Sequence, residues 1–124
     1  MAMNIYESAE DYLETILILQ ERNGVVHSVD VAAEKHFSKA SVSVAMKKLR
    51  ENGYIRMEKD GSLVLLEPGR KIAEHIYERH KALTDYFVSI GVDPETAAKD
   101  ACKIEHDLSD ITFEKMKEDF ARRM

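Results

Sequence analysis

Three side chains that can bind a metal ion lie close together near the end of the sequence. They are Cys102, Glu105 and His106, and the residues around them have helical spacing. Positions i, i+3 and i+4 share one face of a helix, so a thiol, a carboxylate and an imidazole would converge within one turn. These side-chain types bind divalent transition metals. The spacing therefore predicts one part of a metal site.

Two other segments carry further candidate ligands. His80 interrupts an apolar stripe, and Asp11 and Glu14 stand three residues apart in a strongly apolar segment. An ionisable group on a buried helix face is costly unless it is paired or bound to metal. Taken singly, each residue has an ordinary explanation: a core histidine, a solvated helix face, or a cysteine that packs as a small apolar residue. Their combination in one short chain favours the metal site.

The elements that must position these groups follow from hydrophobic spacing and from helix-ending residues. Helices are expected over residues 5–21, 29–35 and 39–52, with Ser28 and Ser38 as the caps of the second and third. Two β-rich runs then flank Lys59-Asp60-Gly61, and Asp-Gly between such runs predicts a hairpin. Three helices followed by a two-stranded hairpin is the order of a winged helix-turn-helix.

A long helix is expected from Pro68 to about Ile90, followed by helices over residues 94–107 and 110–120, the last capped by Ser109. The long helix would measure ~33 Å, more than a lobe of about 65 residues can cover. The prediction is a mainly α fold in two parts. Residues 1–67 would form a winged helix-turn-helix domain that binds DNA, and residues 68–124 a helical domain.

Charge points to the third helix as the DNA-reading element. The 124-residue chain has a net charge of −5, yet residues 35–50 contain five basic and no acidic residues, so this window carries +5 and the remainder −10. A helix that enters the major groove needs small polar or basic residues at its first turn. The candidate DNA contacts are Ser28, Ser38, Lys39, Ala40, Ser41, Ser43, Val44, Lys47, Lys48 and, at the hairpin tip, Lys59. The alternative is a protein-interaction module with a solvated lysine face.

Composition excludes several classes of protein. Apolar residues make up 44% and charged residues 33%, which is ordinary globular composition, and no apolar run is long enough to cross a membrane. The N-terminal segment lacks the basic start and apolar run of a secretory signal, and a single cysteine cannot staple a monomer. We therefore expect a cytoplasmic protein with no membrane partner and no organic small-molecule ligand.

These segments together resemble the diphtheria toxin repressor family of metal-dependent transcription regulators, which includes the manganese transport regulators. The resemblance covers essentially the whole chain and is closest to the short, two-domain members. The matching segments are residues 8–14, the reading helix 38–49, Gly61-Ser62-Leu63-Val64-Leu65, Arg79-His80 and residues 102–109.

The resemblance implies a repressor, not an enzyme, that binds operator DNA as a homodimer when metal is bound and so controls metal-ion homeostasis. It implies a winged DNA-binding domain, a helical dimerisation domain, and a metal ion held between the two. Carried over by position, the ligands would be Asp11, Glu14, His80, Cys102, Glu105 and His106.

The sequence departs from both branches of that family. Asp11 matches the manganese-responsive members, whereas Cys102 matches the iron-responsive members and suits softer ions. The remaining ligands match the manganese branch, so we expect Mn²⁺ rather than Fe²⁺, with Co²⁺ or Zn²⁺ as surrogates. A second, ancillary ion site of the iron branch would fall at Thr84 and Ala98, which cannot supply its ligands.

Two other functions fit parts of the pattern. One is a metal-independent winged-helix regulator in which the histidines and glutamates hold the core of a dimer. The other is a metallohydrolase that uses Cys102, Glu105 and His106. A glycine-rich loop, an oxyanion donor and a fold large enough for a substrate cleft are all missing from the sequence pattern, which disfavours the enzyme.

Overall fold

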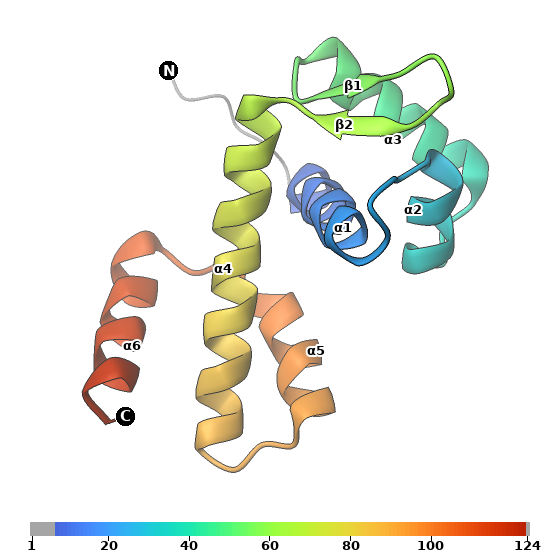
Figure 1. Cartoon of the computed structure of the whole chain (residues 1–124). Coiled ribbons are helices and arrows are strands. Elements are labelled where there is room, and N and C mark those ends of the chain that lie inside the picture. The colour runs from blue at the N-terminus through green and yellow to red at the C-terminus, as the bar shows by residue number, and fades with distance from the viewer. Residues whose placement is uncertain (1–6, 124) are drawn as a thin grey trace. The chain divides into compact units, whose positions relative to one another are not determined.

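The computed structural model of the chain describes residues 7–123 and places six helices and two strands among them (Figure 1). The expected start of the first helix at Ile5 lies outside the described residues. In chain order the elements are α1 (Glu7–Asn23), α2 (Ser28–Lys35), α3 (Lys39–Glu51), β1 (Ile55–Met57), β2 (Leu63–Leu65), α4 (Glu67–Ser89), α5 (Pro94–Ile104) and α6 (Asp110–Arg123). The mainly α fold with a winged helix-turn-helix and a helical second part is confirmed.

The chain forms two compact units, and the boundary between them falls inside α4, between Glu74 and His75. The sequence placed the domain boundary at residues 67 and 68, where α4 begins. The difference arises because the first turns of α4 pack on the hairpin. Leu66 N donates to Tyr54 O at 3.0 Å, and a Cβ at Gly69 would collide with the backbone of Tyr54, so glycine is required there.

The first unit packs α1, α2, α3 and the hairpin around an apolar core. Its side chains repeat at steps of three and four along each helix, which is the pattern of a helix buried on one face. The buried members include Leu13, Ile16 and Leu17 of α1, Val31 of α2, Val42, Met46 and Leu49 of α3, and Ile55, Leu63 and Leu65 of the strands. This core holds α1 and α3 together in one compact unit.

The wing is an antiparallel pair in which Ile55 faces Leu65 and Met57 faces Leu63. Its tip is closed by two backbone hydrogen bonds, from Glu58 N to Ser62 O at 2.8 Å and from Gly61 N to Glu58 O at 2.9 Å. Gly61 has a φ of 86°, a left-handed conformation that favours glycine. The hairpin predicted from Asp60-Gly61 is confirmed.

The cap of α2 was predicted wrongly. The helix begins at Ser28 itself and its N-cap is His27, because the Asp30 carboxylate accepts the backbone N–H of His27 at 2.8 Å. Ser28 is therefore the first residue inside the helix. Ser38, by contrast, caps α3 as predicted, since its Oγ accepts the N–H of Ser41 at 3.1 Å.

The second unit contains the rest of α4 together with α5 and α6. Its buried apolar cluster consists of Leu83, Ala101 and Phe113, with Phe87, Ile104, Leu108 and Met116 packed against it. Asp93 caps α5 by accepting the N–H of Thr96 at 3.0 Å, and Ser109 caps α6 by accepting the N–H of Thr112 at 3.2 Å. Among the described residues, no helix combines the length and the apolar character needed to cross a bilayer.

Candidate metal centre and DNA-reading surface

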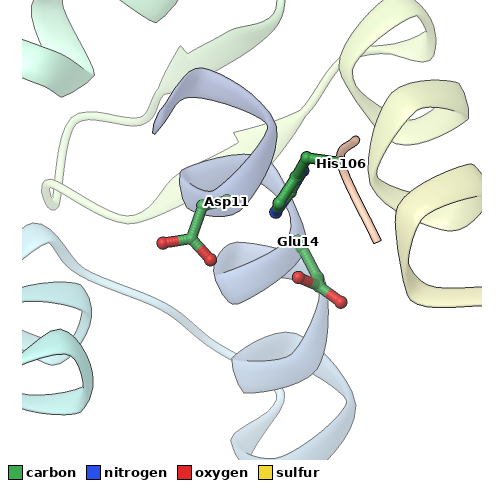
Figure 2. Close-up of side chains that lie close together, drawn as sticks. All are labelled: Asp11, Glu14 and His106. Atoms are coloured by element: carbon green, nitrogen blue, oxygen red, sulfur yellow. The ribbon is translucent and has the colours of Figure 1, made fainter. Parts of the chain in front are cut away.

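The first unit presents two carboxylates on α1. Asp11 and Glu14 are one turn apart, and both side chains project from this helix (Figure 2). Glu14 is buried, with 4% of its surface exposed. Lys35, on the last turn of α2, places its Nζ 2.5 Å from Asp11 Oδ2. The Asp11 carboxylate is therefore already paired with a cation from the same unit.

The second unit brings together three other predicted ligands. His80 Nδ1 lies 2.8 Å from Glu105 Oε2, and His106 Nε2 lies 3.4 Å from Glu105 Oε1. Glu105 is completely buried, and its Oε1 accepts no hydrogen bond from the residues that the structure describes. A fully buried carboxylate between two imidazoles is a strong donor group for a divalent cation.

Glu105 continues the buried face of α5. Ala97, Ala101 and Glu105 follow one another at steps of four, and all three have 0% exposure. The helix itself ends at Ile104, so Glu105 is its C-cap and His106 belongs to the turn that follows. This corrects the expected helix end near residue 107.

Arg79 holds that turn in place. Its Nη1 donates to the carbonyl oxygens of Glu105 at 3.1 Å and of Leu108 at 2.6 Å, and its Nη2 donates to the Asp110 carboxylate. The guanidinium is buried and lies over the Phe113 ring, 5.0 Å from its centre. Arg79 therefore orients the backbone that carries Glu105 and His106.

Cys102 does not share the buried face of Glu105. Its side chain is exposed, because it follows Ala101, the residue that occupies the buried stripe, by about 100° of helix rotation. The thiol of Cys102 is thus exposed, whereas the carboxylate of Glu105 is buried. The role of Cys102 as a ligand stays a prediction.

The donor set fits a divalent metal ion. Carboxylates suit harder ions such as Mn²⁺, and imidazoles suit the first-row transition metals in general. The buried Glu105 Oε1, which accepts no hydrogen bond in the described part of the chain, is an acceptor that a cation would satisfy. Within the second unit, His80, Glu105 and His106 are the groups that could hold it.

The predicted DNA contacts on α3 lie on its exposed face. Val42, Met46 and Leu49 point into the core, whereas the side chains at positions 38–41, 43, 44, 47 and 48 are exposed. Lys59 is exposed at the wing tip, and Ser28 is half-buried at the start of α2. Beside Lys59, the hydroxyl and backbone N–H of Ser62 hold the pKa of Asp60 below its usual value.

Two residues next to the predicted ligands were not predicted to have a role. Arg79 could have been found, because it lies three residues after Ile76 and four before Leu83, both buried. Lys35 could not have been found, because its partner Asp11 stands 24 positions earlier and no local pattern links the two residues.

Two family models together match nearly the whole chain. The model described as "Iron dependent repressor, N-terminal DNA binding domain" matches residues 4–63. The model described as "Iron dependent repressor, metal binding and dimerisation domain" matches residues 66–122.

Curated relatives match over most of their own length. An uncharacterized HTH-type transcriptional regulator of Methanocaldococcus jannaschii is 35% identical over 113 residues, which is 90% of each protein. The HTH-type transcriptional regulator MntR of Geobacillus kaustophilus is 38% identical over 102 residues, covering 82% of this chain and 72% of its own. Both are named as transcriptional regulators, in agreement with the prediction that the chain is not an enzyme.

Solved structures share the fold. A manganese-dependent transcriptional repressor in complex with manganese superimposes with a TM-score of 0.84 at 26% identity, covering 91% of this chain and 52% of that one. The manganese regulator SloR gives a TM-score of 0.80 at 23% identity and covers 96% of this chain and 55% of its own, which is a likeness of fold. The chain thus spans about half the length of these two structures.

Proposed function

This chain belongs to the diphtheria toxin repressor family of metal-dependent transcription regulators, and we propose that it binds operator DNA as a homodimer when a divalent metal ion is bound. Mn²⁺ is the proposed ion in preference to Fe²⁺, and control of metal-ion homeostasis in the cytoplasm is the proposed role. The observation that carries the proposal is Glu105, a fully buried carboxylate with an imidazole on either side.

The proposed ligands come from both units. Asp11 and Glu14 belong to the unit that carries the reading helix, and His80, Glu105 and His106 belong to the other. Cys102 is kept as a proposed sixth ligand. A bound divalent cation would supply two positive charges against the three negative charges of these carboxylates. Because the proposed ligands come from both units, metal binding would also fix the position of the unit that carries the reading helix. Metal binding and placement of the reading helix would then be one coupled equilibrium.

That equilibrium determines how metal and DNA affect one another. If metal-bound and DNA-bound protein favour the same arrangement, each ligand must raise the affinity of the other by the same factor. A coupling of ~1–3 kcal/mol gives a ~5–150-fold change, which is enough for a switch. Without a cation, Asp11, Glu14 and Glu105 would repel one another if they were brought together.

The preference for Mn²⁺ is supported by the ligand types. Among the three carboxylates, Asp11 is the hard oxygen donor that the iron-responsive pattern lacks. The manganese-dependent repressor with 26% identity was solved in complex with manganese. A soft-ion contribution would have to come from the exposed Cys102 thiol.

DNA binding is proposed for the exposed face of α3, with Lys39 and Ser43 toward the major groove and Lys47, Lys48 and Lys59 toward the phosphate backbone. The homodimer is proposed for the second unit, where Val88, Ile90 and Ile111 remain 40%, 55% and 76% exposed. A dimer would set two reading helices at half-sites about one helical turn apart, ~34 Å.

The decisive experiment is the Glu105→Gln variant. Gln keeps the shape of the side chain and its hydrogen bond with His80 but removes the charge. We expect the metal-free variant to melt close to the wild-type temperature. Added Mn²⁺ should then neither raise this temperature nor tighten binding of operator DNA, measured by fluorescence anisotropy with and without a chelator.

Glu78→Gln is the matched control, since it removes an exposed carboxylate from the same unit. Its metal response should equal that of the wild type. A full metal response in Glu105→Gln would refute the site, and wild-type DNA binding that ignores the chelator would favour the metal-independent regulator. Anaerobic titrations of the wild type with Mn²⁺, Fe²⁺, Co²⁺ and Zn²⁺ test the choice of ion.

A further inference from the structure

We propose that Lys35 is a built-in counter-cation of the Asp11 carboxylate, and that it sets the metal concentration to which the protein responds by opposing metal binding at this ligand. The inference rests on the proposed function, because it takes Asp11 to be a metal ligand. Lys35 itself is not among the predicted ligands.

The contact is made within the first unit and joins two of its helices. Lys35 Nζ lies 2.5 Å from Asp11 Oδ2, and the two side chains are only 21% and 22% exposed. An aromatic pair flanks them: Tyr12 and Phe37 meet edge to face with ring centres 6.1 Å apart, and Lys35 Nζ lies 6.0 Å from the Phe37 ring. The ion pair is therefore partly shielded from water.

Shielding makes this pair stronger than an ordinary surface pair. The Lys71–Glu67 pair in the same unit has a separation of 3.6 Å, and its side chains are 75% and 79% exposed. Exposed pairs typically contribute ~0.2–1 kcal/mol, and the attraction rises as the surroundings become less polar. The Lys35 ammonium thus competes for a carboxylate oxygen that the metal ion also needs.

A cation that reaches Asp11 either displaces the Lys35 ammonium or binds next to its positive charge. Both outcomes cost free energy, so the lysine lowers the affinity of the site for any cation. The displaced ammonium would still have a favourable position, because Lys35 lies in the last turn of α2, where basic groups interact well with the helix dipole.

The position of Lys35 also connects the metal ligand to the reading helix. The next residue, His36, adopts a left-handed conformation with a φ of 59° and ends α2, and Ser38 then caps α3. The Asp11–Lys35 pair therefore ties α1 to the turn of the helix-turn-helix. Loss of the Asp11–Lys35 ion pair on metal binding would therefore affect the position of the start of α3.

The first test measures metal affinity by calorimetric or chelator-competition titration of the full chain. Lys35→Met keeps the length of the side chain and removes its charge, and it should bind Mn²⁺ about tenfold more tightly, equivalent to ~1.4 kcal/mol. Lys71→Met is the matched control, and its affinity should equal that of the wild type. Unchanged or weaker binding by Lys35→Met would overturn the inference.

The second test needs no metal. In the presence of a chelator, the unfolding free energies of Lys35→Met, Asp11→Asn and the double variant form a cycle. The double variant should lose clearly less than the two single losses added together, because each single change already breaks the pair. Additive losses would contradict the inference.

Metal titration of the wild type separates a failure of the proposed function from a failure of the role proposed for Lys35. If the wild type binds no Mn²⁺ or other divalent ion, the proposed function fails, whatever the cycle shows. If the wild type binds metal and Lys35→Met matches it, the function stands and Lys35 has no part in setting the response.

Discussion

The two units of this chain are stabilised in different ways. The first has an apolar core that extends through three helices and a hairpin, with Leu13, Ile16 and Val42 completely buried. In the second, the buried apolar cluster has three members, and two charged residues, Arg79 and Glu105, are buried beside it. In the reading unit, the exposed face of α3 that is proposed to bind DNA is separate from the apolar core, although the proposed ligand Glu14 is buried. In the second unit, buried Arg79 both stabilises the fold and positions the proposed metal ligands Glu105 and His106.

The largest effect that would sharpen this comparison is expected from Arg79→Met. The substitution removes the donors to the carbonyls of Glu105 and Leu108 and the partner of Asp110. Breaking a buried charge network costs several kcal/mol, so we expect a loss of about 3 kcal/mol in urea unfolding. Amide hydrogen exchange should rise across residues 75–123 and little across residues 7–74, and metal affinity should fall.

Arg70→Met is the control for this prediction. Arg70 lies on α4 within the first unit, is exposed, and approaches Glu74 only to 3.8 Å. Its loss should change stability by less than about 0.5 kcal/mol. If Arg79→Met were equally mild, the second unit would not depend on its buried guanidinium and the contrast between the units would disappear.

A smaller effect, confined to function, is expected from Lys47→Met in the reading unit. Lys47 is exposed on α3 and contributes nothing to the core, so stability and metal affinity should stay the same. If it contacts a phosphate, DNA affinity should fall by about tenfold or less, and the slope of log affinity against log salt should decrease by about 1. Anisotropy titrations at several salt concentrations measure both quantities. A slope equal to that of the wild type would show that Lys47 does not contact a phosphate.

The same contrast explains how much could be predicted from sequence. The reading helix and the wing follow from local signals, namely the Ser38 cap, the spacing of Val42, Met46 and Leu49, and Asp60-Gly61. Separate clues to the metal site were also visible, since His80 interrupts an apolar stripe. The convergence of these ligands on one ion came from the family resemblance and stays a proposal.

The features that could not be predicted depend on contacts across the chain or on competition between neighbours. The Asp30 carboxylate accepts a hydrogen bond from the backbone N–H of His27, so the N-cap of α2 is His27, one residue before the predicted Ser28. Ala97 and Ala101 lie on the buried face of α5, and in this orientation of the helix Glu105 is buried while Cys102 is exposed. The contact between Asp11 and Lys35 could not be predicted, because neither the residue types nor their spacing in the sequence indicates that the two side chains meet.

The smallest effect is expected at a surface ion pair of the second unit, where Lys117 Nζ donates to Glu78 Oε1 at 2.6 Å. This bond lowers the pKa of Glu78 below 4.5 and raises the pKa of Lys117 above 10.5. The stabilisation from Glu78 is present above pH 4.5 and is lost as the pH falls through its lowered pKa. The stabilisation from Lys117 is present below pH 10.5 and is lost as the pH rises through its raised pKa.

The unfolding free energy of the Glu78→Gln variant should therefore differ from that of the wild type only between the lowered pKa of Glu78 and the raised pKa of Lys117. The side chains of Glu78 and Lys117 are 56% and 43% exposed, so solvent screening reduces the expected loss to about 0.5 kcal/mol at neutral pH. Urea unfolding at neutral and at acidic pH measures the loss, which should shrink at acidic pH and in 1 M salt, at about a 3 Å screening length. A loss as large as that of Arg79→Met would mean that surface charge stabilises this unit as strongly as its buried guanidinium does.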